Sequence, residues 1–188
     1  LPEPPVRSPL AEDGGALVRF QRGRLVHRLL ESLPDLPPAG RGAAARAFLA
    51  RPVWGLDAAT VDQLAAETLA VLDDADFADL FGPGSRAEVP LTGIVGGHVV
   101  SGQVDRMVVT ADMVRIIDYK TNRPPPRRPE DVAEAYVMQM ATYRAVLAQL
   151  YPGRTVSCAL LWTDGPFLMD LPAAALDLAL DALLKGIS

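Results

Sequence analysis

The chain has 188 residues, of which 49% are hydrophobic, and a formal net charge of -5. This length suits one domain, or one domain with a helical extension, and it allows a sizeable core. The negative charge excludes a global positive field as the means of holding nucleic acid, so such a partner requires a local basic patch. Cys158 is the only cysteine, which excludes an intrachain disulfide and a cysteine-ligated zinc or iron–sulfur site built from this chain alone.

The lengths of the apolar runs and the composition of the first residues indicate the cellular location of the protein and the start of its domain. No apolar run reaches the ~18 residues of a membrane-spanning helix, and the first residues lack the basic-then-apolar order of a signal peptide. We therefore expect a cytoplasmic protein without a membrane partner. Residues 1–14 are rich in proline and do not begin with Met, so we expect a linker from a preceding region and then one domain over residues 15–188.

Helical periodicity dominates the first part of this domain, residues 15–81. Apolar residues recur at helical spacing over residues 15–33, and Pro34 ends that helix. A proline- and glycine-rich loop is expected next, at residues 34–42, followed by a helix at residues 43–51. A break at residues 52–55 then precedes an amphipathic helix at residues 58–73.

A sheet core is expected over residues 82–188, where β-branched residues become frequent. The expected strands are residues 87–91, 98–109, 113–120, 156–162 and 167–171, and the expected helices are residues 130–150 and 173–184. Residues 110–112 form a connection short enough for an antiparallel hairpin. This order predicts an α/β fold with a mixed central sheet flanked by helices, together with an N-terminal helical region.

Two aspartates and a lysine carry the chemistry within these strands. Asp118 lies in an otherwise apolar strand, where an unpaired charge is costly, and the hairpin can bring Asp105 beside it. Lys120 shares a strand face with Asp118, because side chains alternate with period two. Carboxylates are the ligands that hard cations prefer, and a nearby lysine can assist an attacking water or stabilise charge on a phosphate. The alternative is a strand-end carboxylate that faces solvent or an arginine.

Four motifs in one order resemble the PD-(D/E)xK superfamily of nucleases, and within it the RecB-like nuclease domains of bacterial helicase-nucleases. Residues 23–27 (Gly-Arg-Leu-Val-His) resemble the family's helical Gly-x-x-x-His element. Residues 102–105 (Gly-Gln-Val-Asp) resemble its Gly-x-(Ile/Val)-Asp strand, and residues 117–121 (Ile-Asp-Tyr-Lys-Thr) its Asp-Tyr-Lys-Thr strand. Residues 139–143 (Gln-Met-Ala-Thr-Tyr) resemble its Gln-x-x-x-Tyr helix.

This resemblance implies a metal site and a catalytic lysine in a restriction-endonuclease-like fold. It makes His27, Asp105 and Asp118 metal ligands, adds the Tyr119 carbonyl as a further oxygen, and makes Lys120 the catalytic lysine. The implied ion is Mg²⁺, for which Mn²⁺ can substitute. The single cysteine departs from relatives that carry an iron–sulfur cluster, so no cluster is expected. The sequence has no Gly-x-x-x-x-Gly-Lys-(Ser/Thr) phosphate loop, so ATP is not expected to bind.

Other residues near these motifs have two interpretations each. His27 taken alone would be a packing histidine of its helix. Gln139 and Tyr143 lie one turn apart on one face, where they would contact DNA or support Lys120, although Tyr143 suits the core equally. Glu88 would reach the ion through a water molecule, or it would be an edge-strand charge that opposes aggregation.

Three arginines follow Lys120 in a loop with three successive prolines: Arg123, Arg127 and Arg128. This place suits contacts with the backbone phosphates of DNA. A solvated loop is the alternative.

Residues 88–91 and 120–123 make the chain most similar to AddA-type proteins within the superfamily. The resemblance implies a Mg²⁺-dependent DNA nuclease domain, acting as an exonuclease, of an ATP-dependent helicase-nuclease in bacterial double-strand break repair and recombination. The implied partners are DNA, a second subunit of an AddB type and a helicase region of the same chain. Two alternatives stay open, namely a free-standing exonuclease and an inactive relative that binds DNA or scaffolds a partner.

Overall fold

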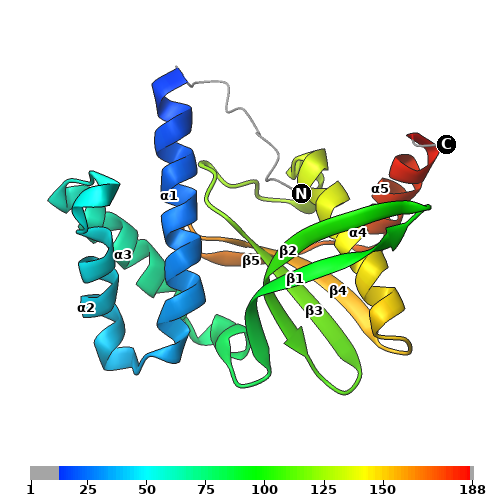
Figure 1. Ribbon diagram of the computed structural model, residues 1–188, viewed down its shortest axis with the longest axis horizontal. Helices are drawn as coiled ribbons and strands as arrows, with labels where there is room; N and C mark the ends of the chain where they lie inside the picture. The colour runs from blue at the N-terminus through cyan, green and yellow to red at the C-terminus, as the bar shows by residue number, and fades with distance from the viewer. Residues whose placement is uncertain (1–12, 187–188) are drawn as a thin grey trace.

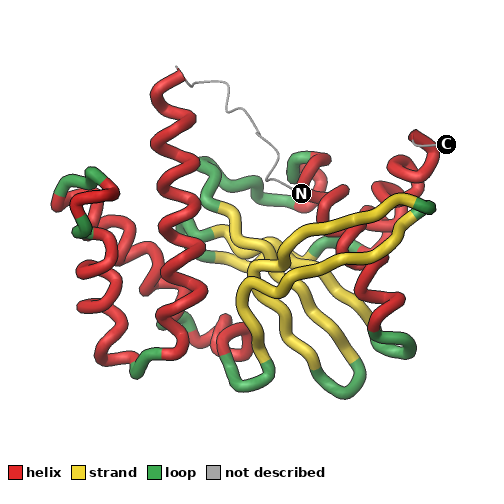
Figure 2. Tube along the Cα trace, viewed as in Figure 1, coloured by secondary structure: helices red, strands yellow, loops and turns green. Residues whose placement is uncertain are grey.

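A computed structural model describes residues 13–186, in which two groups of helices lie on either side of one sheet (Figure 1). One group comprises α1 (Asp13–Ser32), α2 (Pro38–Leu49) and α3 (Ala58–Leu72), and the other comprises α4 (Glu134–Leu150) and α5 (Ala173–Gly186). Figure 2 shows the same division, with red helices around a yellow sheet. Residues 1–12 of the expected linker lie outside the described residues, and residues 13 and 14 belong to α1. No helix of the described part could span a membrane.

The second helix begins earlier than the sequence predicted. It starts at Pro38, so the glycine-rich segment expected as a loop is helical. Proline fits there because the N–H that it lacks would have no acceptor in the first turn. Gly40 and Gly42 weaken a helix intrinsically. Ala45 and Leu49 offset this by full burial among the neighbouring helices.

The sheet has five strands in the order β1-β2-β3-β4-β5. Their bounds are β1 (Ser85–Val95), β2 (His98–Val109), β3 (Met113–Lys120), β4 (Thr155–Trp162) and β5 (Phe167–Asp170). β3 and β4 are parallel and are joined through α4, whereas the other neighbouring pairs are antiparallel. The predicted mixed sheet and the predicted β2–β3 hairpin are both confirmed.

Strand β1 is longer than predicted because a glycine within it serves packing. It continues beyond residue 91 to Val95 and turns into β2 through Gly96 and Gly97, whose φ angles are 57° and 81°. A Cβ atom on Gly93 would lie 2.5 Å from Cγ1 of Val146 on α4. Gly93 therefore lets α4 approach the hairpin, and it does not end the strand.

Short 3₁₀ turns link several elements: η1 (Leu33–Asp35), η2 (Pro52–Trp54), η3 (Ala75–Phe81) and η4 (Pro129–Asp131). The last one explains why α4 begins at residue 134 and not at residue 130. Arg128 donates two hydrogen bonds of 3.0 Å to Asp131, and Val132 and Ala133 then adopt non-helical backbone before the helix starts.

Alternation along β3 divides the core into two clusters. Val114 and Ile116 pack with α4 and α5, whereas Ile117 and Tyr119 pack with α1, α2 and α3. Both faces of β3 are thus covered, which explains its nearly continuous apolar sequence. By the same alternation, residues 118 and 120 face α4.

Candidate metal centre

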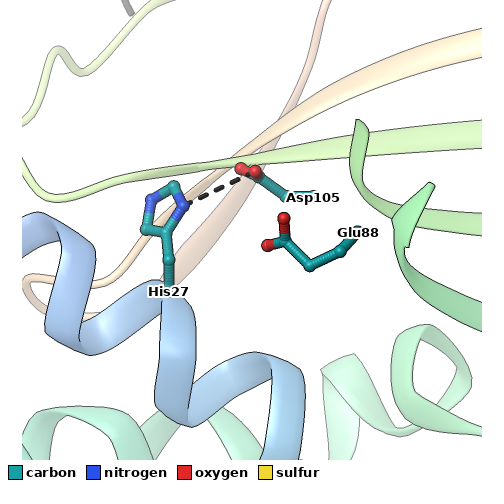
Figure 3. A group of neighbouring side chains, drawn as sticks. All are labelled: His27, Glu88 and Asp105. Carbon is teal, nitrogen blue, oxygen red and sulfur yellow. Dashed lines mark ion pairs between the residues drawn. The ribbon is translucent and has the colours of Figure 1, made fainter. Parts of the chain in front are cut away.

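Three side chains from three elements converge in Figure 3: His27 of α1, Glu88 of β1 and Asp105 of β2. One ligand atom of each lies within 4.8 Å of the other two, and all three residues are half-buried. Nδ1 of His27 is 3.5 Å from Oδ1 of Asp105, and the Glu88 carboxylate points toward both side chains. Ligand atoms that share one Mg²⁺ at about 2.1 Å lie roughly 3–4 Å apart. Small side-chain adjustments would therefore suffice to hold a divalent cation.

The backbone of Glu88 turns its carboxylate into this cluster. Its φ is 51°, in the left-handed region, and no other non-glycine residue among residues 13–186 has a positive φ. The β1–β2 ladder pairs Ala87 with Arg106 and Val89 with Val104, so Glu88 and Asp105 lie opposite each other. The left-handed conformation costs about 1–2 kcal/mol for a residue with a side chain. Strain of this kind concentrates at functional sites.

The backbone of Tyr119 contacts both Asp105 and His27. Its backbone N–H donates to Oδ2 of Asp105 over 2.7 Å, and its carbonyl oxygen lies 3.1 Å from Nε2 of His27. When Nε2 carries the proton, it donates to that carbonyl, and the lone pair of Nδ1 then faces the Asp105 carboxylate. Two lone pairs that face each other require a proton or a cation between them.

Helix α1 comes close enough for this contact because of Gly23. A Cβ atom at that position would lie 3.1 Å from Oγ1 of Thr121, the residue that follows β3. The glycine of the Gly-x-x-x-His motif thus packs against the threonine of the Asp-Tyr-Lys-Thr motif. The two motifs therefore meet in one packing contact, and this contact places His27 over Tyr119.

Asp118 and Lys120 form a buried ion pair next to the cluster. The pairing of Arg106 with Ile117 places Asp118 opposite Asp105 at the end of the β2–β3 ladder. Lys120 Nζ lies 2.5 Å from Oδ2 of Asp118 and 3.7 Å from the centre of the Tyr136 ring on α4. Asp118 is 6% exposed and Lys120 is 1% exposed. The Asp118 carboxylate is thus directed to Lys120 and is not a member of the cluster of His27, Glu88 and Asp105.

Burial and neighbouring charges shift the pKa values of three carboxyl groups. Burial disfavours the charged form of Asp105, but His27 and a backbone N–H outweigh it and lower the pKa of Asp105. Burial, aided by the charge of Asp105, raises the pKa of Glu88. Burial also raises the pKa of Asp118 to about 6, with Asp105 acting in the same direction and Lys120 against it. A cation at the cluster would relieve this crowding of negative charge.

Gln139 and Tyr143 are buried under the β1–β2 hairpin. Gln139 is 9% and Tyr143 is 1% exposed, and Nε2 of Gln139 lies 3.4 Å from the Tyr143 hydroxyl. A Cβ atom on Gly102 would lie 2.2 Å from the same hydroxyl oxygen. This burial suits the supporting role considered for the two residues, and it leaves little of their surface for contact with DNA.

The three loop arginines differ in their surroundings. Arg123 pairs with Glu67 at 3.0 Å and with Asp164 at 3.2 Å, and Arg128 pairs with Asp131. Arg127 is exposed. Arg123 and Arg128 thus hold the loop together through acidic partners, and Arg127 is the one whose surroundings suit the predicted contact with phosphate.

Sequence reasoning missed two buried charged residues near the site, Glu67 and Arg106. Glu67 of α3 pairs with Arg22 and Arg123 and accepts a hydrogen bond of 2.5 Å from the Thr163 hydroxyl. Arg106 donates to the Tyr119 hydroxyl over 2.9 Å. The one signal in the sequence was that Arg106 lies next to Asp105 in an apolar strand. Glu67 has the pattern of a solvated helix charge.

The fold and the four motifs define a class of nuclease. Residues 7–175 match the profile of the PD-(D/E)XK nuclease superfamily. The chain belongs to this superfamily, as the motifs indicated, and its mixed sheet flanked by helices is of the restriction-endonuclease-like class.

Two known proteins show what the chain is similar to within that class. Over 59 residues, or 31% of this chain, it is 39% identical to an ATP-dependent helicase/nuclease subunit of Lactiplantibacillus plantarum, and the match spans 5% of that protein's length. Its fold is similar to that of a protein from Eubacterium rectale with the provisional name of exonuclease, with a TM-score of 0.59. That likeness covers 88% of this chain and 65% of the other at 15% identity, so it concerns the fold alone.

Proposed function

We propose that this chain is a divalent-metal-dependent deoxyribonuclease domain that acts as an exonuclease. The observation that carries the proposal is the convergence of His27, Glu88 and Asp105, with the strained backbone of Glu88 directed into the cluster. An imidazole with two carboxylates is a donor set for Mg²⁺ or Mn²⁺. Membership of the nuclease superfamily supports hydrolysis of a phosphodiester over other uses of such an ion.

His27, Glu88 and Asp105 would hold the cation. Asp118 and the Tyr119 carbonyl would complete the set once they turn from their present partners, Lys120 and Nε2 of His27. Such an ion supplies polarisation of the phosphate and a lower pKa for the attacking water. Asp105 has the lowered pKa of a group that is ionised at neutral pH. The hydrogen bond from the Tyr119 N–H fixes the orientation of that carboxylate.

Lys120 contributes a fixed positive charge. Its ammonium lies between the Asp118 carboxylate and the face of the Tyr136 ring. Because the side chain is buried, its charge acts with little screening by water. We infer that it stabilises the negative charge that grows on the phosphate when the diester is attacked.

The similarity to a helicase/nuclease subunit supports a place for this domain in a larger machine. We propose that the parent is an AddA-type protein with its own helicase region and a partner subunit of an AddB type, and that it acts in double-strand break repair and recombination in the bacterial cytoplasm. The exposed Arg127, in the loop that follows β3, would contact the DNA backbone.

The test is degradation of linear DNA by the 188-residue chain with Mg²⁺ or with Mn²⁺. We expect Asp105→Asn to abolish degradation and Lys120→Ala to slow it by about 100-fold or more. Asp62→Asn is the matched control, because Asp62 lies in an exposed ion pair with Arg46 on the helical side. Circular DNA should resist. Equal degradation by all variants, or degradation in excess chelator, would refute the proposal.

A further inference from the structure

Arg106 makes polar contacts with three different elements from a buried position. The side chain follows Asp105 on β2 and is 4% exposed. Its Nη2 donates to the Leu30 carbonyl over 2.7 Å, its Nε to the Tyr119 hydroxyl over 2.9 Å, and its Nη1 to Oγ of Ser85 over 3.2 Å.

Each acceptor belongs to an element that carries a member of the candidate metal centre or contacts one. Leu30 lies on α1, three residues after His27. Ser85 begins β1, three residues before Glu88. The backbone of Tyr119 contacts two members of the centre. Its N–H donates to Asp105, and its carbonyl oxygen lies 3.1 Å from Nε2 of His27.

We propose that Arg106 is the positioning residue of the metal centre, which holds α1, β1 and β3 around β2 so that His27, Glu88 and Asp105 converge. The inference rests on the metal site of the proposed function. Arg106 touches neither substrate nor ion in this role, and it acts through the elements that it joins.

The geometry of the guanidinium group suits this role. Its five donors have a fixed planar arrangement, so three acceptors in different directions can be satisfied at once. The Leu30 carbonyl belongs to the last turn of α1, where carbonyls lack intrahelical partners and the helix dipole favours a positive charge. The face of Phe81 lies 4.8 Å from the guanidinium carbon and covers the group.

The alternative is that Arg106 only stabilises the fold, and two variants with one control separate these roles. Arg106→Met removes the donors and the charge, whereas Arg106→Lys keeps the charge but cannot reach three acceptors. Arg144→Met is the control, because Arg144 also spans a backbone carbonyl and a carboxylate, on Val156 and Asp177, away from the centre.

The first measurement is the ¹⁵N resonance of the His27 ring by NMR without added metal. The chain has two histidines, and His98, exposed at the end of the β1–β2 hairpin, is the internal reference. We expect both Arg106 variants to shift the His27 resonance and to leave that of His98 unchanged. Arg144→Met should change neither resonance.

The second measurement is Mn²⁺ affinity by calorimetry. We expect both Arg106 variants to bind Mn²⁺ about 10- to 100-fold more weakly than the wild type, as is usual when support of metal ligands is lost. Arg144→Met should bind as the wild type does. If Arg106→Met does not fold, Arg106→Lys decides by the same criteria.

The two proposals fail in different ways. A folded Arg106 variant with a wild-type His27 resonance overturns the positioning role. If the wild type binds no Mn²⁺, the proposed metal site is wrong. The His27 resonance of the Arg106 variants then still shows whether Arg106 positions that side chain.

Discussion

The hydroxyl of Tyr143 occupies the space that a side chain at Gly102 would need, since a Cβ atom there would lie 2.2 Å from that oxygen. Gly102 belongs to the strand motif that ends in Asp105, and Tyr143 belongs to the helix motif that begins at Gln139. Two motifs far apart in sequence are therefore the two sides of one packing contact between β2 and α4. The contact fixes the strand three residues before Asp105.

Replacement of Gly102 by alanine should therefore destabilise the fold. We expect Gly102→Ala to lower the free energy of unfolding by about 1–3 kcal/mol through overpacking against the buried Tyr143 ring. The measurement is urea denaturation. Gly40→Ala on α2 is the control, because nothing lies within 4 Å of a Cβ atom there. In that helix, alanine should stabilise by about 0.5–1 kcal/mol. If Gly102→Ala unfolds with at least the free energy of the wild type, Tyr143 yields freely and the contact is unimportant.

Glu88 should make the protein without metal less stable as pH rises. Its pKa is raised in the fold, so the unfolded chain loses this proton first, and the associated stability is lost as pH rises through the folded-state pKa. Gln at this position does not titrate. We therefore expect the unfolding free energy of Glu88→Gln, relative to that of the wild type, to increase from about pH 4 to about pH 7.

Metal should favour the wild type over Glu88→Gln, because an ion that binds only the folded state stabilises it. Mn²⁺ at neutral pH is expected to raise the melting temperature of the wild type more than that of Glu88→Gln. If the difference in unfolding free energy between the two proteins is independent of pH, and Mn²⁺ stabilises both equally, Glu88 does not share the site.

The helices and strands that depend on periodicity could be predicted from the sequence. α1 and α3 agree with the predicted helices to within two residues, and the β2–β3 hairpin follows from its short connection. The start of α2 and the end of β1 could not be predicted locally. Glycines in both places argue against regular structure. On α2 the burial of Ala45 and Leu49 offsets them, and in β1 the close contact of Gly93 with Val146 explains the glycine.

The site could be predicted in part, because its motifs lie in the right order along the chain. His27 and Asp105 do converge, whereas Asp118, expected as a further metal ligand, pairs with Lys120. The convergence of Glu88 depends on a left-handed backbone that no periodicity indicates. The contacts of Arg106 with three elements require the folded arrangement, since its acceptors lie between 13 and 76 residues away.

Glu67 should matter for stability far more than a surface carboxylate of the same helix. Its side chain is 6% exposed, and its removal leaves the part-buried Arg22 without that carboxylate. We expect Glu67→Ala to lower the free energy of unfolding by about 3–5 kcal/mol, as for other broken buried pairs. Asp62→Ala, which removes an exposed pair with Arg46, should cost less than about 1 kcal/mol. Equal losses in urea denaturation would rule out the buried network as a structural support.

Titration of the chain with Mn²⁺ by calorimetry tests most directly whether His27, Glu88 and Asp105 hold a divalent cation. We predict saturable binding to the wild type, a large loss of affinity in Asp105→Ala and in Glu88→Gln, and wild-type binding in Asp62→Ala. Absence of saturable binding to the folded wild type, or equal affinity in Asp105→Ala, would contradict the claim.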